Sequence, residues 1–177
     1  MILLERTIQE QIWLLIPIIA SILIFSKIKR NNPLILKATL LSHFSKAQFN
    51  QIESNKADYN FISLYWISIF FHGVYLHSAF FIENDSAYLI YVFIALLILT
   101  KKFLLNISSW LFEQKELFKR YLTSHHSTVI TQGLLILPAA IINIIYQDNL
   151  LMVNKIVLFL ILLFLIYKVS YYFFEGR

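Results

Sequence analysis

Long apolar runs without full charges constrain the fold of this chain more than any other feature of its sequence. The residues from Tyr59 to Ile82 include no Asp, Glu, Lys or Arg, and the segment LFLILLFLIY occupies 158–167. A helix of about 20 residues crosses the roughly 30 Å hydrocarbon core of a bilayer, because each residue rises about 1.5 Å. The chain is also 59% hydrophobic and 14% charged, outside the usual balance of a soluble domain. The sequence therefore predicts a membrane protein.

Five apolar stretches meet this length condition, and they predict an all-α, polytopic helical membrane protein with one helical domain over 1–177. The predicted spans are 8–26, 60–82, 86–105, 128–146 and 150–174. The third span requires Lys101 and Lys102 to extend their ammonium groups to the interface, because its uncharged run ends there. In the first span the basic residues follow the apolar run, which favours an uncleaved helix over a signal peptide.

The distribution of Lys and Arg predicts the orientation of these spans. Six basic residues lie between the first and second spans, and five lie in the last turns of the third span or between it and the fourth, whereas the short connections ENDS and QDN contain none. Cytoplasmic connections carry the excess of basic residues, so we expect the N-terminus outside and the C-terminus inside. The balance of 15 Lys and Arg against 10 Asp and Glu then reflects attraction to anionic headgroups, and no nucleic acid partner is expected.

Both basic connections show a helical periodicity of apolar residues, over 33–54 and 107–122. The residues aligned on one side are Leu34, Ala38, Leu41, Phe49 and Ile52 in the first, and Trp110, Leu111, Gln114, Leu117, Phe118 and Tyr121 in the second. These patterns predict two cytoplasmic amphipathic helices. They lie either in the inner interface, with lysines toward anionic lipid, or against the bundle or a partner.

Two histidines and a proline are the candidate binding features. His72 lies near the middle of the second span and His77 nearer its outer end, and ionisable groups at such depth suggest function. A neutral histidine bonded to a neighbouring hydroxyl or carbonyl is the structural alternative. Pro138 interrupts the fourth span as in the broken helices of transporter sites, with Gln132 and Asn143 on the same helix. A simple kink is the alternative for the proline.

The sequence offers little for catalysis or metal binding. It contains no Cys, only three Gly and no HExxH motif, and its acidic residues lie outside the spans or, for Glu10, at the outer edge of the first. His72 and His77 are five residues apart and point in different directions on a helix. His125 and His126, to which no role is assigned, lie at the inner end of the fourth span. We therefore expect no catalytic residue, metal or cofactor, with haem shared between two copies through His72 as an alternative.

The order of features is also informative. An N-out helix is followed by the amphipathic stretch LLSHFSKAQFNQI, an aromatic hairpin, a second amphipathic stretch, and YLTSHHSTVITQGLLILP leading into a Pro-containing span. This order resembles a family of multi-pass inner-membrane proteins of Bacteroidota known as domain of unknown function 4271. The resemblance implies residence in the bacterial inner membrane and supplies no reaction. Family members continue into a sixth helix, so the resemblance implies either a shortened version or a helix supplied by a partner.

From these features we expect a non-enzymatic subunit or accessory factor of a membrane assembly. Its expected partners are the lipid bilayer and either further copies of itself or other membrane subunits. A small transporter or ligand-binding membrane protein is the second interpretation. A haem-handling protein or intramembrane enzyme is the third.

Overall fold

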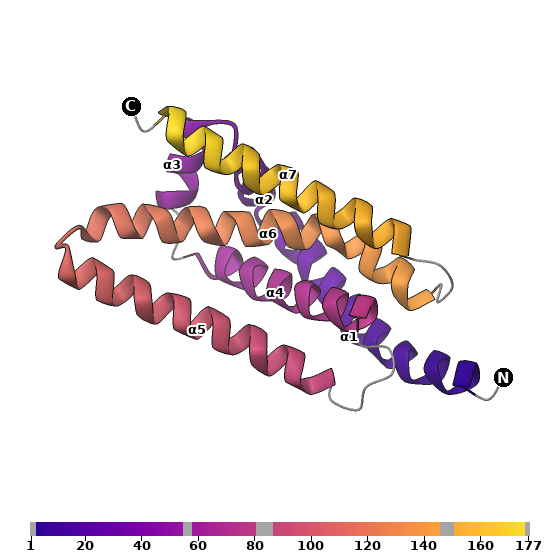
Figure 1. Ribbon diagram of the computed structural model, residues 1–177. Coiled ribbons are helices and arrows are strands. Elements are labelled where there is room, and N and C mark those ends of the chain that lie inside the picture. The colour runs from indigo at the N-terminus through magenta and orange to yellow at the C-terminus, as the bar shows by residue number, and fades with distance from the viewer. Residues whose placement is uncertain (1–2, 55–57, 81–86, 146–150, 176–177) are drawn as a thin grey trace.

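The computed structural model describes residues 3–54, 58–80, 87–145 and 151–175, and within these ranges it has seven helices and no strand (Figure 1). The expected all-α fold is confirmed. In chain order the helices are α1 (Leu3–Asn31), α2 (Pro33–Leu41), α3 (Lys46–Ser54), α4 (Tyr59–Phe80), α5 (Ala87–Leu111), α6 (Lys115–Ile145) and α7 (Leu151–Glu175).

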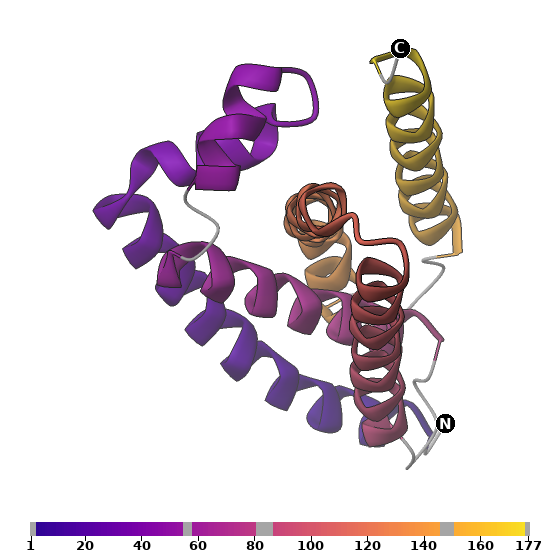
Figure 2. The ribbon, with the colours of Figure 1, turned by 90° about the vertical axis from the view of Figure 1, so that its left-hand side faces the viewer.

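Helix α6 is the centre of the bundle. It packs along α4, and Figure 2 shows it nearly end-on, with α1 and α4 to one side and α7 on the other. The two central helices approach closely at Gly133, where an added Cβ would lie 2.6 Å from the Cβ of Ser68. Only a residue without a side chain permits this approach.

Two buried apolar clusters follow the α4–α6 pair. The first joins it to α2, α3 and the end of α1, and the second joins it to the middle of α1. The first consists of Ile28, Ile35, Ala38, Ile52, Phe61, Leu64, Tyr65 and Ile130, and the second of Ile18, Val74, Tyr75, Ile136, Ala139, Ala140 and Ile144.

The predicted amphipathic helix over 33–54 is two short helices in the structure. Residues 42–45 separate α2 from α3, and here the Ser42 hydroxyl donates to the Thr39 carbonyl at 2.7 Å. Such a local side-chain bond competes with continuation of the helix.

The interruption changes which side of this segment faces the bundle. Ile35 and Ala38 of α2 are buried, whereas Leu34 and Leu41 of the predicted stripe are 59% and 38% exposed. Ile52 of α3 is also buried. Of the two placements expected for this segment, the structure therefore has packing against the bundle.

The predicted separate helix over 107–122 is wrong. Residues 107–111 complete α5, a turn with Glu113 in the left-handed region (φ 53°) follows, and Lys115 begins α6. Helix α6 then continues through the polar run TSHHST without a break. The run does not interrupt the helix because the threonine hydroxyls donate to carbonyls four residues earlier. These bonds are Thr123 to Lys119 (3.1 Å), Thr128 to Ser124 (2.7 Å) and Thr131 to Ser127 (3.0 Å).

Among the described residues, two helices are long and apolar enough to cross a membrane, Tyr91–Leu111 of α5 and Phe118–Ile145 of α6. This is fewer than the five spans expected. Helix α4 carries no full charge, but polar side chains such as Asn60, His72 and His77 lower its apolar content. The core helix of a soluble protein can meet the same two conditions, and the α6 stretch is 56% buried. The α5 stretch is 0% buried and does not resemble a soluble core.

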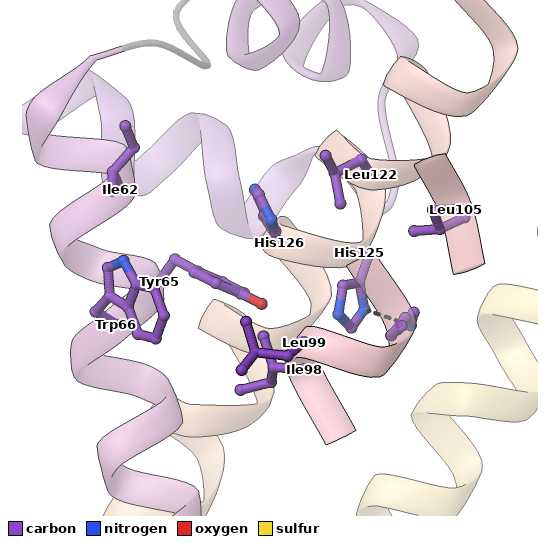
Figure 3. Close-up of a pocket in the computed structure, with 10 residues that line it drawn as sticks. Ile62, Tyr65, Trp66, Ile98, Leu99, Leu105, Leu122, His125 and His126 are labelled. Carbon is purple, nitrogen blue, oxygen red and sulfur yellow. Dashed lines mark hydrogen bonds between the residues drawn. The ribbon is translucent and has the colours of Figure 1, made fainter. Parts of the chain in front are cut away.

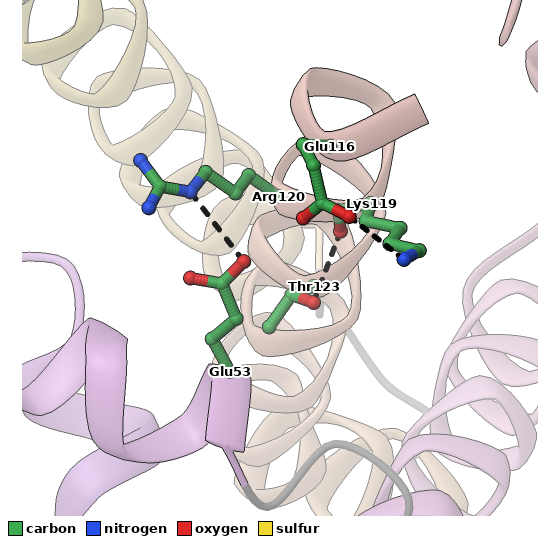
Figure 4. Close-up of polar contacts among 5 residues, drawn as sticks. All are labelled: Glu53, Glu116, Lys119, Arg120 and Thr123. Atoms are coloured by element: carbon green, nitrogen blue, oxygen red, sulfur yellow. Dashed lines mark hydrogen bonds and ion pairs between the residues drawn. The ribbon is translucent and has the colours of Figure 1, made fainter. Parts of the chain in front are cut away.

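Both basic connections lie at one end of the bundle. The end of α1, the helices α2 and α3 and the turn between α5 and α6 are found there, together with the end of α7, while α1 begins at the opposite end (Figure 1). An ion pair joins the two connections, with Nε of Arg120 3.5 Å from Oε1 of Glu53 (Figure 4). Glu116 and Lys119 pair within α6 at 2.9 Å.

Candidate functional site

Four consecutive residues of α6, 124–127, each contact a different neighbouring element, and we call them the polar segment. Successive residues of a helix point about 100° apart, so four residues face all round it. Ser124 lies toward α7, His125 toward α5, His126 toward α4, and Ser127 toward the end of α2. The polar segment is therefore a common attachment point for the bundle.

The contact toward α2 is a buried network of hydroxyls around His43. Nε2 of His43 lies 2.9 Å from Oγ1 of Thr131 and 3.3 Å from Oγ of Ser127. Oγ of Ser127 lies 2.6 Å from Oγ of Ser42 and 3.0 Å from the carbonyl oxygen of Thr39. All five residues are less than 9% exposed. The turn after α2, which places Ser42 and His43 inward, thus joins α2 to α6.

Most bonds of the network have a direction fixed by the available protons, because each hydroxyl has a single proton to donate. Nε2–H of His43 donates to Oγ1 of Thr131, whose own proton goes to the Ser127 carbonyl. The Ser127 hydroxyl donates to Oγ of Ser42, which donates to the Thr39 carbonyl. The two serine protons serve three contacts, so in this arrangement the 3.0 Å contact between Oγ of Ser127 and the Thr39 carbonyl oxygen carries no proton of its own.

His43 is neutral at physiological pH. Burial lowers its pKa to about 4, and the positive charge of Lys168 acts in the same direction, while a bond to Ser127 opposes both. A neutral imidazole beside Ser127 resembles the base–nucleophile pair of a hydrolase. However, no carboxylate orients the ring among its described contacts, and all members of the network are buried. The geometry therefore supports a structural cross-link.

The contacts toward α4 and α5 line a pocket of about 290 Å³ (Figure 3). Nζ of Lys101 lies 3.0 Å from Nδ1 of His125, and the ring of Tyr65 lies 4.1 Å from that of His126. Figure 3 shows the Tyr65 hydroxyl pointing into the pocket toward the histidines. The lining residues are Ile62, Tyr65, Trp66, Ile98, Leu99, Lys101, Leu105, Leu122, His125 and His126. Lys101, which the sequence predicts to reach the interface, bonds to His125 at this end of α6.

On the α7 side, a lysine contacts the polar segment through the backbone. Nζ of Lys168 donates to the Ser124 carbonyl at 2.9 Å. The same carbonyl also accepts from the Thr128 hydroxyl. A lysine within an apolar helix thus has a defined partner on the neighbouring helix.

The two candidate histidines of α4 lie apart from this pocket. Nδ1 of His72 donates to the Ser68 carbonyl of its own helix at 2.7 Å. This is the bond to a neighbouring carbonyl that is expected of a histidine with a structural role. Nδ1 of His77 is buried and has no hydrogen-bond partner among the described residues. Neither residue lines the pocket of Figure 3.

The candidates on α6 also do not form a site with His72. Gln132 is half-buried, and Pro138 is exposed within a helix that continues to Ile145. Asn143 is fully buried, and its Nδ2 donates to Oδ1 of Asn154 on α7 at 2.9 Å. Asn143 therefore joins α6 to α7.

Four residues of the site were not among the binding candidates predicted from the sequence. They are His43, Tyr65, Lys101 and Lys168. Lys168 carried a usable signal, because a lysine inside an apolar run needs a polar partner. The run TSHHST carried a second, since six consecutive polar residues beside an apolar span need partners on several sides. His43 carried none, since its partner on α6 is 88 residues away in sequence.

Within the described ranges, no cluster of three or more His, Cys, Asp or Glu side chains could hold a metal ion. Comparison of the chain with protein-family models, curated proteins and solved structures finds no match. The site itself therefore has to support any functional conclusion.

Proposed function

We propose that the chain is a multi-pass helical membrane protein that serves as a non-enzymatic subunit or accessory factor of a membrane assembly. The observation that carries this proposal is the surface of α5 and α7. Helix α7 packs through a narrow stripe that includes Val153, Val157 and Ile161, while Leu, Ile and Phe side chains make up most of its exposed surface, with Lys155 and Tyr167 as the exceptions. Lipid is the solvent that such a surface requires, because soluble monomers rarely expose large contiguous apolar patches.

The proposed topology has five spans, α1, α4, α5, α6 and α7, with the N-terminus outside. Two features support it. Both basic connections lie at the same end of the bundle. Helix α7 finishes at this end, whereas α1 begins at the opposite end (Figure 1). An odd number of spans requires this separation, and the basic end is cytoplasmic by the positive-inside rule. Residence in a bacterial inner membrane, and membership of the family of domain of unknown function 4271, are further parts of the proposal.

The non-enzymatic role is supported by what the polar segment does. Its contacts join α6 to α2, α4, α5 and α7, and the His43 network has no opening to substrate. Polar side chains that bond to one another between helices stabilise a membrane bundle by about 0.6 kcal/mol each on average. The arrangement therefore fits a scaffold better than a reaction centre.

Sizing of the complex tests the assembly role. The protein is extracted from membranes in a mild detergent, and its mass is measured by light scattering after correction for bound detergent. We expect a stoichiometric oligomer or complex, well above the 20.9 kDa of one chain, that dissociates in SDS. A stable, monodisperse single chain would contradict it.

A ligand-binding membrane protein is the second candidate function. The pocket between α4, α5 and α6 favours it, because apolar walls with a few convergent polar groups are typical of small-molecule sites.

A further inference from the structure

We infer that the pocket between α4, α5 and α6 binds an anionic amphiphile, with its phosphate group at Lys101 and His125 and its acyl chain against Trp66 and Leu99. The inference rests on the proposed membrane insertion, because it takes the open side of the pocket to face lipid.

The pocket has a polar inner end and an apolar mouth. His125 and Lys101 are half-buried, and Tyr65, whose hydroxyl points inward, is 7% exposed (Figure 3). At the mouth, Trp66 and Leu99 are 56% and 61% exposed. A ligand that fills the pocket from the lipid side must therefore carry a polar group at one end and an apolar chain at the other.

The charge of the pocket selects an anion. Lys101 contributes a positive charge, and none of the described lining residues is Asp or Glu. An ammonium group has donors and no acceptor, so the Nδ1 atom of His125 accepts its hydrogen bond. The neutral ring of His125 then carries its proton on Nε2, which makes it a second donor. Lys101, His125 and the Tyr65 hydroxyl together offer several donors and one charge, as a phosphate requires.

The second lysine near the polar segment strengthens this selection. Lys168 donates to the Ser124 carbonyl, one residue before His125, and adds a positive charge on the α7 side. No salt bridge to Lys101 is found among the described residues. A partly desolvated positive charge without a carboxylate is stabilised when an anion binds close to it.

The volume limits what part of a lipid the pocket holds. About 290 Å³ lies at the lower end of the range for small-molecule sites. It suits a phosphate group and the first part of one chain, and the remainder of the lipid stays in the bilayer. A second pocket, beside Trp110 and Lys119, shares Leu105 and Leu122 with the first and continues it toward the basic end of the bundle.

Trp66 provides the reporter for a test, since it lines the mouth of the pocket. A full-length protein with Trp13→Phe and Trp110→Phe retains Trp66 as its single tryptophan and is reconstituted in phosphatidylcholine vesicles. Phosphatidic acid with brominated acyl chains is added at increasing mole fraction, and quenching of Trp66 fluorescence is compared with quenching by brominated phosphatidylcholine. We expect half-maximal quenching at about a tenfold lower mole fraction of the anionic lipid, as one charge-assisted contact would produce.

Three variants separate the pocket from general surface charge. Lys101→Gln should remove the preference for the anionic lipid, and Lys101→Arg should retain it. Lys29→Gln, which removes an exposed charge outside the pocket, should also retain it. In each variant, unchanged quenching by brominated phosphatidylcholine shows that α4 is still inserted.

The outcomes distinguish the inference from the proposed function. Equal quenching by both lipids, or a preference that survives Lys101→Gln, overturns the inference and leaves membrane insertion intact. The absence of quenching by either lipid overturns the proposed function itself. Inorganic phosphate at millimolar concentration forms the third arm: we expect it to leave quenching unchanged, whereas displacement of the brominated lipid would show that the site takes free phosphate and that no acyl chain is required.

Discussion

Replacement of Gly133 by alanine tests the close packing of α4 and α6, on which the bundle depends. The added Cβ would lie 2.6 Å from the Cβ and 2.9 Å from the Cα of Ser68. The Cα belongs to the backbone of α4, so relief requires the two helices to separate. Gly73→Ala is the matched control, because its Cβ would meet the ring of Tyr91 at 2.5 Å, and a side chain can rotate away.

The expected magnitudes follow from two opposing effects. Alanine in place of glycine within a helix is favourable by roughly 0.5–1 kcal/mol at either position. Overpacking against a fixed neighbour costs about 1–3 kcal/mol. This cost is expected at Gly133, where the neighbour is backbone, and is largely avoided at Gly73, where the neighbour is a side chain. We therefore expect Gly133→Ala to lower the free energy of unfolding by about 0.5–2 kcal/mol, and Gly73→Ala to change it little.

The measurement is the free energy of unfolding in mixed micelles, followed by circular dichroism during titration with SDS. A double variant with Ser68→Gly removes the nearer contact, so it should recover part of the loss caused by Gly133→Ala. Equal effects of the two alanine variants, or the lack of any recovery in the double variant, would refute the close α4–α6 contact as we describe it.

Three further predictions concern individual side chains. Because the pKa of His43 is lowered from 6.5 to about 4 on folding, stability should be constant above pH 6.5 and should fall from there toward pH 4, by up to about 1.4 kcal/mol per pH unit. His43→Gln should flatten the profile, and parallel profiles would contradict the assignment. Glu53→Gln breaks an ion pair with the exposed Arg120 of α6 and should cost less than about 1 kcal/mol, so a loss of several kcal/mol would show that the pair is a principal link between the two basic connections. His72→Ala should lower stability by roughly 0.6–2 kcal/mol, and the native protein should show no Soret band; a Soret band abolished by this variant would instead establish haem binding.

The positions of the long helices followed from the sequence, because uncharged apolar runs leave few other structures available. The places where helices end or continue through polar residues did not follow from the sequence. The run TSHHST has the polarity of a connection, yet it lies within α6, since its hydroxyls bond to the helix backbone and its other groups find partners on adjacent helices. That outcome depends on neighbours that are remote in sequence.

The prediction of a single amphipathic helix over 33–54 was wrong for a related reason. It assumed one straight helix, so Leu34 and Leu41 were placed on the same side as Ile52. A break at Ser42 starts a new helix with its own phase and turns His43 inward, where it meets α6. A local pattern cannot predict such a break when the bond that stabilises it, from Ser42 to Ser127, spans 85 residues.

Single-cysteine labelling of intact cells tests the proposed multi-pass topology most directly. The chain has no native cysteine, so each introduced thiol reports without background. Asp85→Cys, in the connection between α4 and α5, should react with a membrane-impermeant maleimide added outside intact spheroplasts. Lys115→Cys, at the exposed start of α6, should react only after lysis. Reaction at both positions before lysis, or at Lys115→Cys alone, would contradict the orientation and the number of spans.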